Sequence, residues 1–248
     1  MCRHLAYLGT PIALSTVLFD APHALAVQSR APRHQPSGRI NPDGWGVAWY
    51  EDDRSSPTPI RPEPERYRST TPVWSDDLFA DGARRAGAIV AAARLASPGT
   101  TLDVHNNAPF VSGHWAFSLN GYGFRGNRGP RLLAALSPAR RAALQGDADS
   151  EVLFGLVLDR IDRGADATTA VLEVTALVDP DDDMNVNLLL ADGARITATA
   201  WGNSLFVLDA TDRFVVASEP LDDDPAWRPV PDRTVVSSAH LTTYGGSR

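Results

Sequence analysis

The sequence contains one cysteine, Cys2, directly behind the initiator methionine. A single thiol forms neither an intrachain disulfide nor a cysteine cluster for a metal. If Met1 is removed, Cys2 carries a thiol and a free α-amine on the same residue. Such an amine titrates near ~7.7 to 8.0, so at neutral pH part of it is a base for the thiol. We therefore predict that Cys2 is an N-terminal nucleophile; the alternative is an inert, small apolar side chain.

An apolar stretch from Leu5 to Phe19 resembles the core of a secretory signal, whose cleavage would delete Cys2. Gly9 and Pro11 interrupt this stretch, and the only basic residue ahead of it besides a histidine is Arg3. A short strand, a turn at residues 9 to 11 and a second apolar segment explain the same residues. No other segment approaches the ~20 apolar residues that cross a bilayer. We therefore expect a cytoplasmic protein that does not enter a membrane.

Four further polar residues have types that amide chemistry requires. A thiolate that attacks an amide carbonyl creates an oxyanion, which needs donors held in advance. Asn120 and Gly121 follow an apolar run and offer a side-chain amide and a backbone N–H, although an ordinary Asn-Gly turn explains the pair equally well. Arg94 follows another apolar run and is a candidate for binding a carboxylate. Asp149 precedes a helical pattern, where it either binds a substrate ammonium or caps the helix.

The charge and the other motifs exclude several classes of function. A formal net charge of -7 argues against nucleic-acid binding, which needs a basic face. The glycine-rich run at residues 121–126 matches a dinucleotide fingerprint, but Gly129 and Pro130 interrupt the helix that should follow. The acidic turn at residues 179–183 lacks the glycine and the distal glutamate of a calcium loop. Neither a zinc-hydrolase nor a serine-hydrolase motif is present. We expect a small-molecule ligand, no metal and no cofactor.

Many short apolar runs, with helical patterns grouped between them, predict an α+β layered fold rather than repeated βαβ units. A Pro-rich, charged stretch, residues 51–64, is expected as a surface excursion, and no linker divides the chain. We therefore expect one domain over residues 1–248. Strands are predicted at residues 2–8, 46–50, 87–93, 114–119, 186–191, 196–201, 205–208, 214–217 and 234–238. Helices are predicted at residues 131–135, 151–163 and 168–178, with Asp149 or Ser150 as the cap of the second.

Six ordered motifs resemble those of class II glutamine amidotransferase domains, which are N-terminal nucleophile hydrolases. Two later segments resemble the second half of the stand-alone members, so that the resemblance covers essentially the whole chain. The six motifs are Cys2 behind Met1, Asp43-Gly44-Trp45-Gly46, Arg94-Leu95-Ala96-Ser97-Pro98-Gly99, Asn107-Ala108-Pro109-Phe110, Ser118-Leu119-Asn120-Gly121 and Asp149-Ser150-Glu151. The later segments are Asn187-Leu188-Leu189-Leu190 and Ala217-Ser218-Glu219-Pro220-Leu221, with Trp227 and Pro231 beyond.

The resemblance implies a four-layer αββα fold, in which two antiparallel sheets stack and the first residue of the mature chain lies at their edge. It also implies a role for each candidate residue. Cys2 is the nucleophile, Asn120 and Gly121 form the oxyanion hole, and Arg94 and Asp149 bind the carboxylate and the amine of a glutamyl group. Ser97 is expected beside them in the substrate site. The reaction implied is release of glutamate from a γ-glutamyl amide through a thioester on Cys2.

Two departures from the glutamine-hydrolysing pattern locate the chain within this family. Pro98 and Leu119 stand where that pattern has histidines, and there is no room for a synthase domain. Both variants resemble those of the γ-glutamyl amidohydrolases of ergothioneine biosynthesis. Their leaving group carries a trimethylammonium, which an aromatic face or a carboxylate would bind, and the chain has six tryptophans. Two alternatives stay open: a glutaminase subunit that supplies ammonia to a separate synthase, and a glutamyl-binding protein without catalysis.

Overall fold

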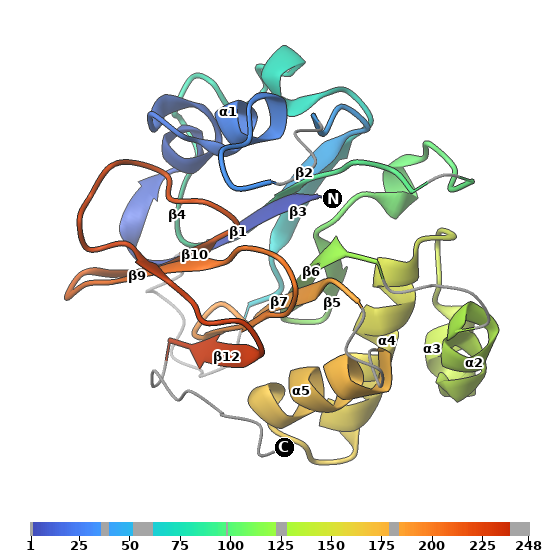
Figure 1. Cartoon of the computed structure of the whole chain (residues 1–248). Helices are drawn as coiled ribbons and strands as arrows, with labels where there is room; N and C mark the ends of the chain where they lie inside the picture. The colour runs from blue at the N-terminus through green and yellow to red at the C-terminus, as the bar shows by residue number, and fades with distance from the viewer. Residues whose placement is uncertain are drawn as a thin grey trace.

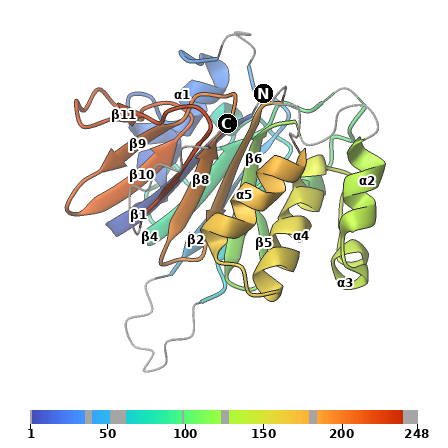
Figure 2. The same ribbon diagram turned by 60° about the horizontal axis from the view of Figure 1, so that its bottom comes forward.

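The computed structural model describes residues 2–35, 40–51, 62–97, 99–122, 128–178 and 184–238. Met1, Pro98, most of the Pro-rich stretch, most of the glycine-rich run and the acidic turn lie outside the described residues. Two antiparallel sheets stack on each other (Figures 1 and 2). Helices cover the outer face of each sheet, so that the described chain has four layers, as expected from the resemblance.

The wider sheet has seven strands in the order β11-β9-β10-β1-β4-β2-β3. Its centre is β1, which pairs with β10 on one side and with β4 on the other. A central strand is held by two ladders of hydrogen bonds, so the residues at its start have fixed positions. The strands are β1 (Arg3–Ala13), β2 (Trp45–Tyr50), β3 (Glu65–Ser69), β4 (Arg85–Ala93), β9 (Phe206–Asp209), β10 (Arg213–Ala217) and β11 (Arg228–Pro229).

The second sheet has five strands in the order β12-β8-β7-β6-β5. Its strands are β5 (Phe110–Ser112), β6 (Trp115–Gly121), β7 (Val186–Ala191), β8 (Ile196–Ala200) and β12 (Thr234–Ser237). Every residue of β7 is buried, because one face of the strand meets the other sheet and its opposite face meets helices. Burial on both faces explains why this strand is apolar in the sequence except at Asn187.

The helices lie in two groups. Above the wider sheet in Figure 1 lie the short helical turn η1 (Thr16–Asp20) and α1 (Leu25–Arg30). Against the second sheet lie α4 (Asp149–Asp162) and α5 (Ala167–Val178), with α2 (Arg128–Ala135) and α3 (Pro138–Ala142) beside α4. Two further helical turns are η2 (Val73–Ser75) and η3 (Val104–Asn106). No helix in the described part of the chain is long and apolar enough to cross a membrane.

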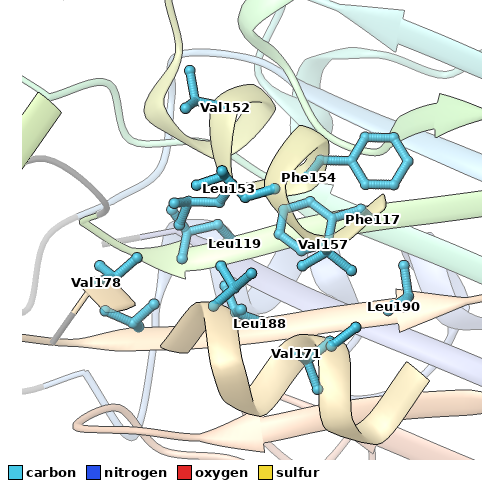
Figure 3. Close-up of a cluster of buried hydrophobic side chains, with 14 of the residues drawn as sticks. Phe117, Leu119, Val152, Leu153, Phe154, Val157, Val171, Val178, Leu188 and Leu190 are labelled. Atoms are coloured by element: carbon cyan, nitrogen blue, oxygen red, sulfur yellow. The ribbon is translucent and has the colours of Figure 1, made fainter. Parts of the chain in front are cut away.

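Three apolar layers fill the space between these elements. The layer between the two sheets is rich in alanine and includes Ala6, Ala88, Ala116 and Ala198. Larger side chains pack between the wider sheet and α1, and between the second sheet and the pair α4 and α5 (Figure 3). Burial of this apolar surface is the main source of stability.

The predicted turn at residues 9 to 11 is wrong, because β1 runs on to Ala13. Its pairing with β4 shifts register between Leu8 and Ile12, and this irregularity accommodates Pro11, which has no N–H for a ladder. Gly9 is needed there because a Cβ would collide with the carbonyl oxygen of Asp212. Sequence reasoning also missed α1, α3, β3 and the short β5 and β11, because none of them forms a long apolar pattern.

Candidate active site

One pocket lies at the start of β1 and brings together five of the six residues predicted from the sequence. Cys2, Arg94, Ser97, Gly121 and Asp149 all line it. They come from four places in the fold: the start of β1, the loop after β4, the end of β6 and the start of α4. The N-terminal end of β1 is marked in Figure 1. Residues separated by up to about 150 positions in the sequence therefore line one pocket, because the stacked sheets bring the ends of their strands together.

Cys2 is partly buried at the edge of the sheets and is one of the residues that line the pocket. Its Sγ is 3.8 Å from the carbonyl oxygen of Leu95, a weak contact at most. The carbonyl oxygen of Cys2 accepts a hydrogen bond of 3.0 Å from Nε of Arg3. The backbone of Cys2 is thus held while the sulfur stays accessible, which is the arrangement a nucleophile requires.

Arg94 is buried directly after β4, and both ends of its peptide group are held. Its N–H donates to the carbonyl of Gly44 (2.8 Å), and its carbonyl accepts from Asp43 (3.1 Å). The guanidinium donates to the hydroxyl of Thr100 (3.0 Å) and to the carbonyl of Thr101 (3.2 Å), both uncharged. No ion pair joins Arg94 to an acidic side chain of the described residues. A fixed cation without a charged partner is suited to bind a carboxylate in two parallel hydrogen bonds.

Asp149 is the first residue of α4, two positions before the predicted start. The cap position is occupied by Ala148, which makes no side-chain cap bond, so the prediction that Asp149 or Ser150 caps this helix is wrong. The Asp149 carboxylate accepts the N–H of Ser150 at 2.7 Å and faces the pocket. Glu151 instead accepts the N–H groups of Gln145 and Gly146, both at 2.9 Å. The Asp149 carboxylate is placed where it can meet a substrate ammonium.

Gly121 lines the pocket, whereas Asn120 lies behind it and is fully buried. A Cβ on Gly121 would collide with the carbonyl of Asn185, and its φ of +152° is rarely adopted by other residues, so only glycine fits. Nδ2 of Asn120 donates to Oγ of Ser218 at 3.4 Å. The carbonyl of Asn120 accepts from the amide of Asn203 at 2.8 Å.

Sequence reasoning gave no role to the buried polar group behind the nucleophile. Arg3 and Glu219 form an ion pair of 3.0 Å in which each side chain is 1% exposed. Beside it, Nδ1 of His4 lies 2.9 Å from the hydroxyl of Ser118. Burial, and then the charge of Arg3, lower the pKa of His4 to about 3, so its imidazole is neutral at pH 7. The sequence carried one signal for this group: Arg3 and His4 begin the apolar segment that forms β1, the central strand of the wider sheet.

No group of three or more metal-ligating side chains gathers in the described residues. None of the six tryptophans is among the described residues that line the Cys2 pocket. Trp45 and Trp49 are buried in the apolar layer under α1. The cation of Arg233 lies over the ring of Trp201, at 4.7 Å from its centroid. The suggested aromatic face for a leaving group is therefore not found among these lining residues.

Known proteins with similar sequences and folds point to one family. The family model for class II glutamine amidotransferases matches residues 14–209. The chain is 38% identical over 245 residues to a gamma-glutamyl-hercynylcysteine sulfoxide hydrolase of Mycolicibacterium smegmatis, covering 97% of this chain and 98% of that protein. A solved class II domain protein from Silicibacter pomeroyi, titled a glutamine aminotransferase, superposes with a TM-score of 0.66 at 25% identity, covering 95% of this chain and 94% of that one.

The glutamine phosphoribosylpyrophosphate amidotransferase of Bacillus subtilis shares the fold, with a TM-score of 0.64 at 14% identity over 95% of this chain and 47% of that one. These similarities agree with the stacked antiparallel sheets and flanking helices described above. The predicted α+β fold and the predicted family are thus both confirmed. The chain belongs to the class II glutamine amidotransferase family.

Proposed function

We propose that this protein is a cysteine-dependent amidohydrolase that releases glutamate from γ-glutamyl-hercynylcysteine sulfoxide, a step of ergothioneine biosynthesis. The observation that carries the proposal is the pocket in which a thiol, a cation with no acidic partner among the described residues and a carboxylate meet. The similarity to a hydrolase of that substrate supports the choice of leaving group. The substrate is a small molecule, and we expect the enzyme to work in the cytoplasm without a metal or cofactor.

The glutamyl group fits the charges of the pocket. Its α-carboxylate would bind the guanidinium of Arg94, and its α-ammonium would bind the carboxylate of Asp149. Ser97 lines the same wall and would contact this group. The two opposite charges on the α-carbon of the ligand fix its orientation, so that the γ-carbonyl at its other end is directed to Cys2.

The reaction then proceeds in two steps. The α-amine of Cys2 takes the proton of the thiol, and the resulting thiolate forms a bond to the γ-carbon. The carbonyl oxygen becomes an oxyanion that the N–H of Gly121 and the amide of Asn120 stabilise. Collapse of this intermediate breaks the C–N bond, and the leaving amine takes a proton from the α-amine of Cys2. Water, deprotonated by the same amine, hydrolyses the thioester and releases glutamate. His4 cannot replace the amine, because it is fully buried and bonded to Ser118.

This mechanism requires removal of Met1, because otherwise the nitrogen of Cys2 is an amide without basicity. Intact-mass measurement of the purified protein tests that requirement. A mature chain that begins at Cys2 would support the mechanism. A chain that retains Met1 would contradict both the mechanism and the proposed activity.

A second candidate is a glutaminase subunit that passes ammonia to a separate synthase, which the family match favours. Glutamate release should be measured with γ-glutamyl-hercynylcysteine sulfoxide and, separately, with glutamine. We expect a strong preference for the conjugate. A preference for glutamine would support the second candidate, and release from neither would leave a glutamyl-binding protein as the explanation.

A further inference from the structure

Two polar residues that follow β10 directly, Ser218 and Glu219, are both fully buried beside the start of β1. They hold the residues on either side of the nucleophile, although neither lines the pocket. We propose that Ser218 and Glu219 are positioning residues, which fix the amide of Asn120 and the backbone of Cys2 relative to each other. This inference rests on the proposed function, because it assigns the pair to the same reaction.

The hydroxyl of Ser218 connects the nucleophile strand to the oxyanion amide. Its Oγ accepts the N–H of His4 at 3.0 Å and Nδ2 of Asn120 at 3.4 Å, and it donates to the carbonyl of His4 at 3.2 Å. The N–H of Ser218 donates to the same carbonyl at 2.9 Å. A hydroxyl has one hydrogen and two lone pairs, and all three are used here. One side chain thus joins the residue two positions after Cys2 to Asn120.

Asn120 depends on this contact for its orientation. Its amide carries two hydrogens on Nδ2, and the bond to Ser218 occupies one of them. The second hydrogen remains available for an oxyanion. The Oδ1 atom of Asn120 is buried and has no hydrogen-bond partner among the described residues. Ser218 is therefore the side chain that sets the plane of this amide in the described structure.

Glu219 holds the other side of the strand. One carboxylate oxygen accepts from Arg3 at 3.0 Å and from the N–H of His34 at 3.0 Å, and its partner accepts the N–H of Arg33 at 2.8 Å. Arg3 in turn donates through Nε to the carbonyl of Cys2 at 3.0 Å. The carboxylate thus fixes the arginine, and the arginine fixes the nucleophile's own peptide group. Ser218 thus bonds to the backbone of His4, and Glu219 acts on Cys2 through Arg3.

The alternative interpretation is that Ser218 and Glu219 only provide hydrogen-bond partners for other buried polar groups and have no effect on the reaction. Buried polar groups need partners, and an ion pair that loses one member destabilises a protein strongly. That interpretation predicts lower stability but normal turnover in every molecule that folds. Positioning predicts slower turnover in folded molecules, because an oxyanion donor displaced by a fraction of an ångström stabilises the transition state less.

Ser218→Ala should be compared with Ser29→Ala. Ser29 is also fully buried, and its hydroxyl donates only to the carbonyl of Ala26 at 3.0 Å in α1, away from the pocket. Turnover is measured with γ-glutamyl-hercynylcysteine sulfoxide and expressed per folded molecule, whose concentration is taken from the amplitude of the urea-unfolding transition. Removing an oxyanion donor outright costs ~10²–10³ in kcat, so for Ser218→Ala we expect a loss of about 10-fold with KM within about twofold. Ser29→Ala should keep both constants.

A double variant tests the second residue without leaving a buried charge unpaired. Arg3→Met with Glu219→Leu replaces the ion pair by apolar side chains, a change that is often neutral for stability. We expect a folded protein with reduced kcat per folded molecule. Wild-type kcat per folded molecule in Ser218→Ala or in this double variant would overturn the inference. A wild-type protein that releases glutamate from no γ-glutamyl amide would overturn the proposed function, and the inference with it.

Discussion

Two regions of the interior differ in the polarity of their buried side chains. One is the layer between the second sheet and α4 and α5, here the helical side, and the other surrounds the start of β1, here the nucleophile side after the proposed role of Cys2. Between the second sheet and α4 and α5, the buried side chains are apolar; Phe117 stacks on Phe154 with ring centroids 5.3 Å apart (Figure 3). At the start of β1, the fully buried side chains are polar or charged, among them His4, Asn120 and Ser218. Both regions exclude water, but they contribute to the protein in different ways.

Apolar packing is non-directional, and it stabilises in proportion to the area that it removes from water. Buried hydrogen bonds contribute little net stability, yet they fix atoms to within a few tenths of an ångström. Nε2 of His4 and Oδ1 of Asn120 have no described hydrogen-bond partner, and each such atom costs ~1–3 kcal/mol. The helical side therefore contributes much of the free energy of folding. The nucleophile side lowers it through its unpaired buried polar atoms, while its hydrogen bonds fix the residues behind the pocket.

The largest expected effect on the nucleophile side is that of Cys2→Ala. Glutamate release should fall at least ~10³-fold, because no other group can form the thioester. The melting temperature should shift by no more than a few degrees, about what 0.5–1 kcal/mol produces, because Cys2 is only partly buried and its sulfur makes one long contact. Activity assays and thermal unfolding on the same preparation check both parts. Retention of a tenth of the activity would contradict the assignment of the nucleophile.

Phe117→Ala should give the opposite pattern. We expect a loss of ~3–5 kcal/mol in the free energy of unfolding, because a fully buried ring leaves a cavity against Phe154. Turnover per folded molecule should not change. Urea unfolding measures the first quantity, and its amplitude gives the concentration of folded molecules by which kcat is normalised. Leu177→Ala is the matched control, because this side chain of α5 is 42% exposed and its truncation should cost less than ~0.5 kcal/mol. Equal losses at both positions would contradict the description of this layer.

Asp149→Asn tests whether the carboxylate at the start of α4 binds substrate. Loss of a charged contact worth ~1.5–3 kcal/mol should raise KM for the conjugate roughly 10- to 100-fold. Asp166→Asn is the control, because Asp166 precedes α5 and accepts the N–H of Thr169 outside the pocket. Steady-state kinetics of both variants make the comparison. An unchanged KM in Asp149→Asn would remove this residue from the substrate site.

The smallest effect at neutral pH is expected from His4, which changes stability only as the pH falls below ~6.5. Its pKa is about 3 in the folded protein and ~6.5 when unfolded, so between these values the unfolded chain binds one more proton. Stability should therefore fall as pH decreases below ~6.5, by up to ~1.4 kcal/mol per pH unit from this residue, and the decrease should end near pH 3. Urea unfolding at several pH values should show a shallower slope for His4→Gln than for the wild type. Equal slopes would show that His4 is not buried in its neutral form.

Much of the fold could be predicted from local patterns. Apolar runs identified β4, β7 and β10, and the helical periodicity at residues 151–163 identified α4 apart from its first turn. The errors lie where long-range pairing outweighs local preference. β1 continues through Pro11 because Ile12 and Ala13 pair again with β4 after the register shift. The edge strand β3 is short and polar, so its sequence carries no strand pattern.

The sequence by itself determined that the only thiol stands at position 2 and that a cation and a carboxylate follow at positions 94 and 149. Their types limit the chemistry, and the order of their motifs indicates the family. Only the tertiary structure decided that these groups share a pocket and that Ser218 and Glu219 lie behind the nucleophile. The physical reason is that strand pairing joins residues far apart in the chain, as Leu5 joins Ala217, and no local pattern encodes such a distance.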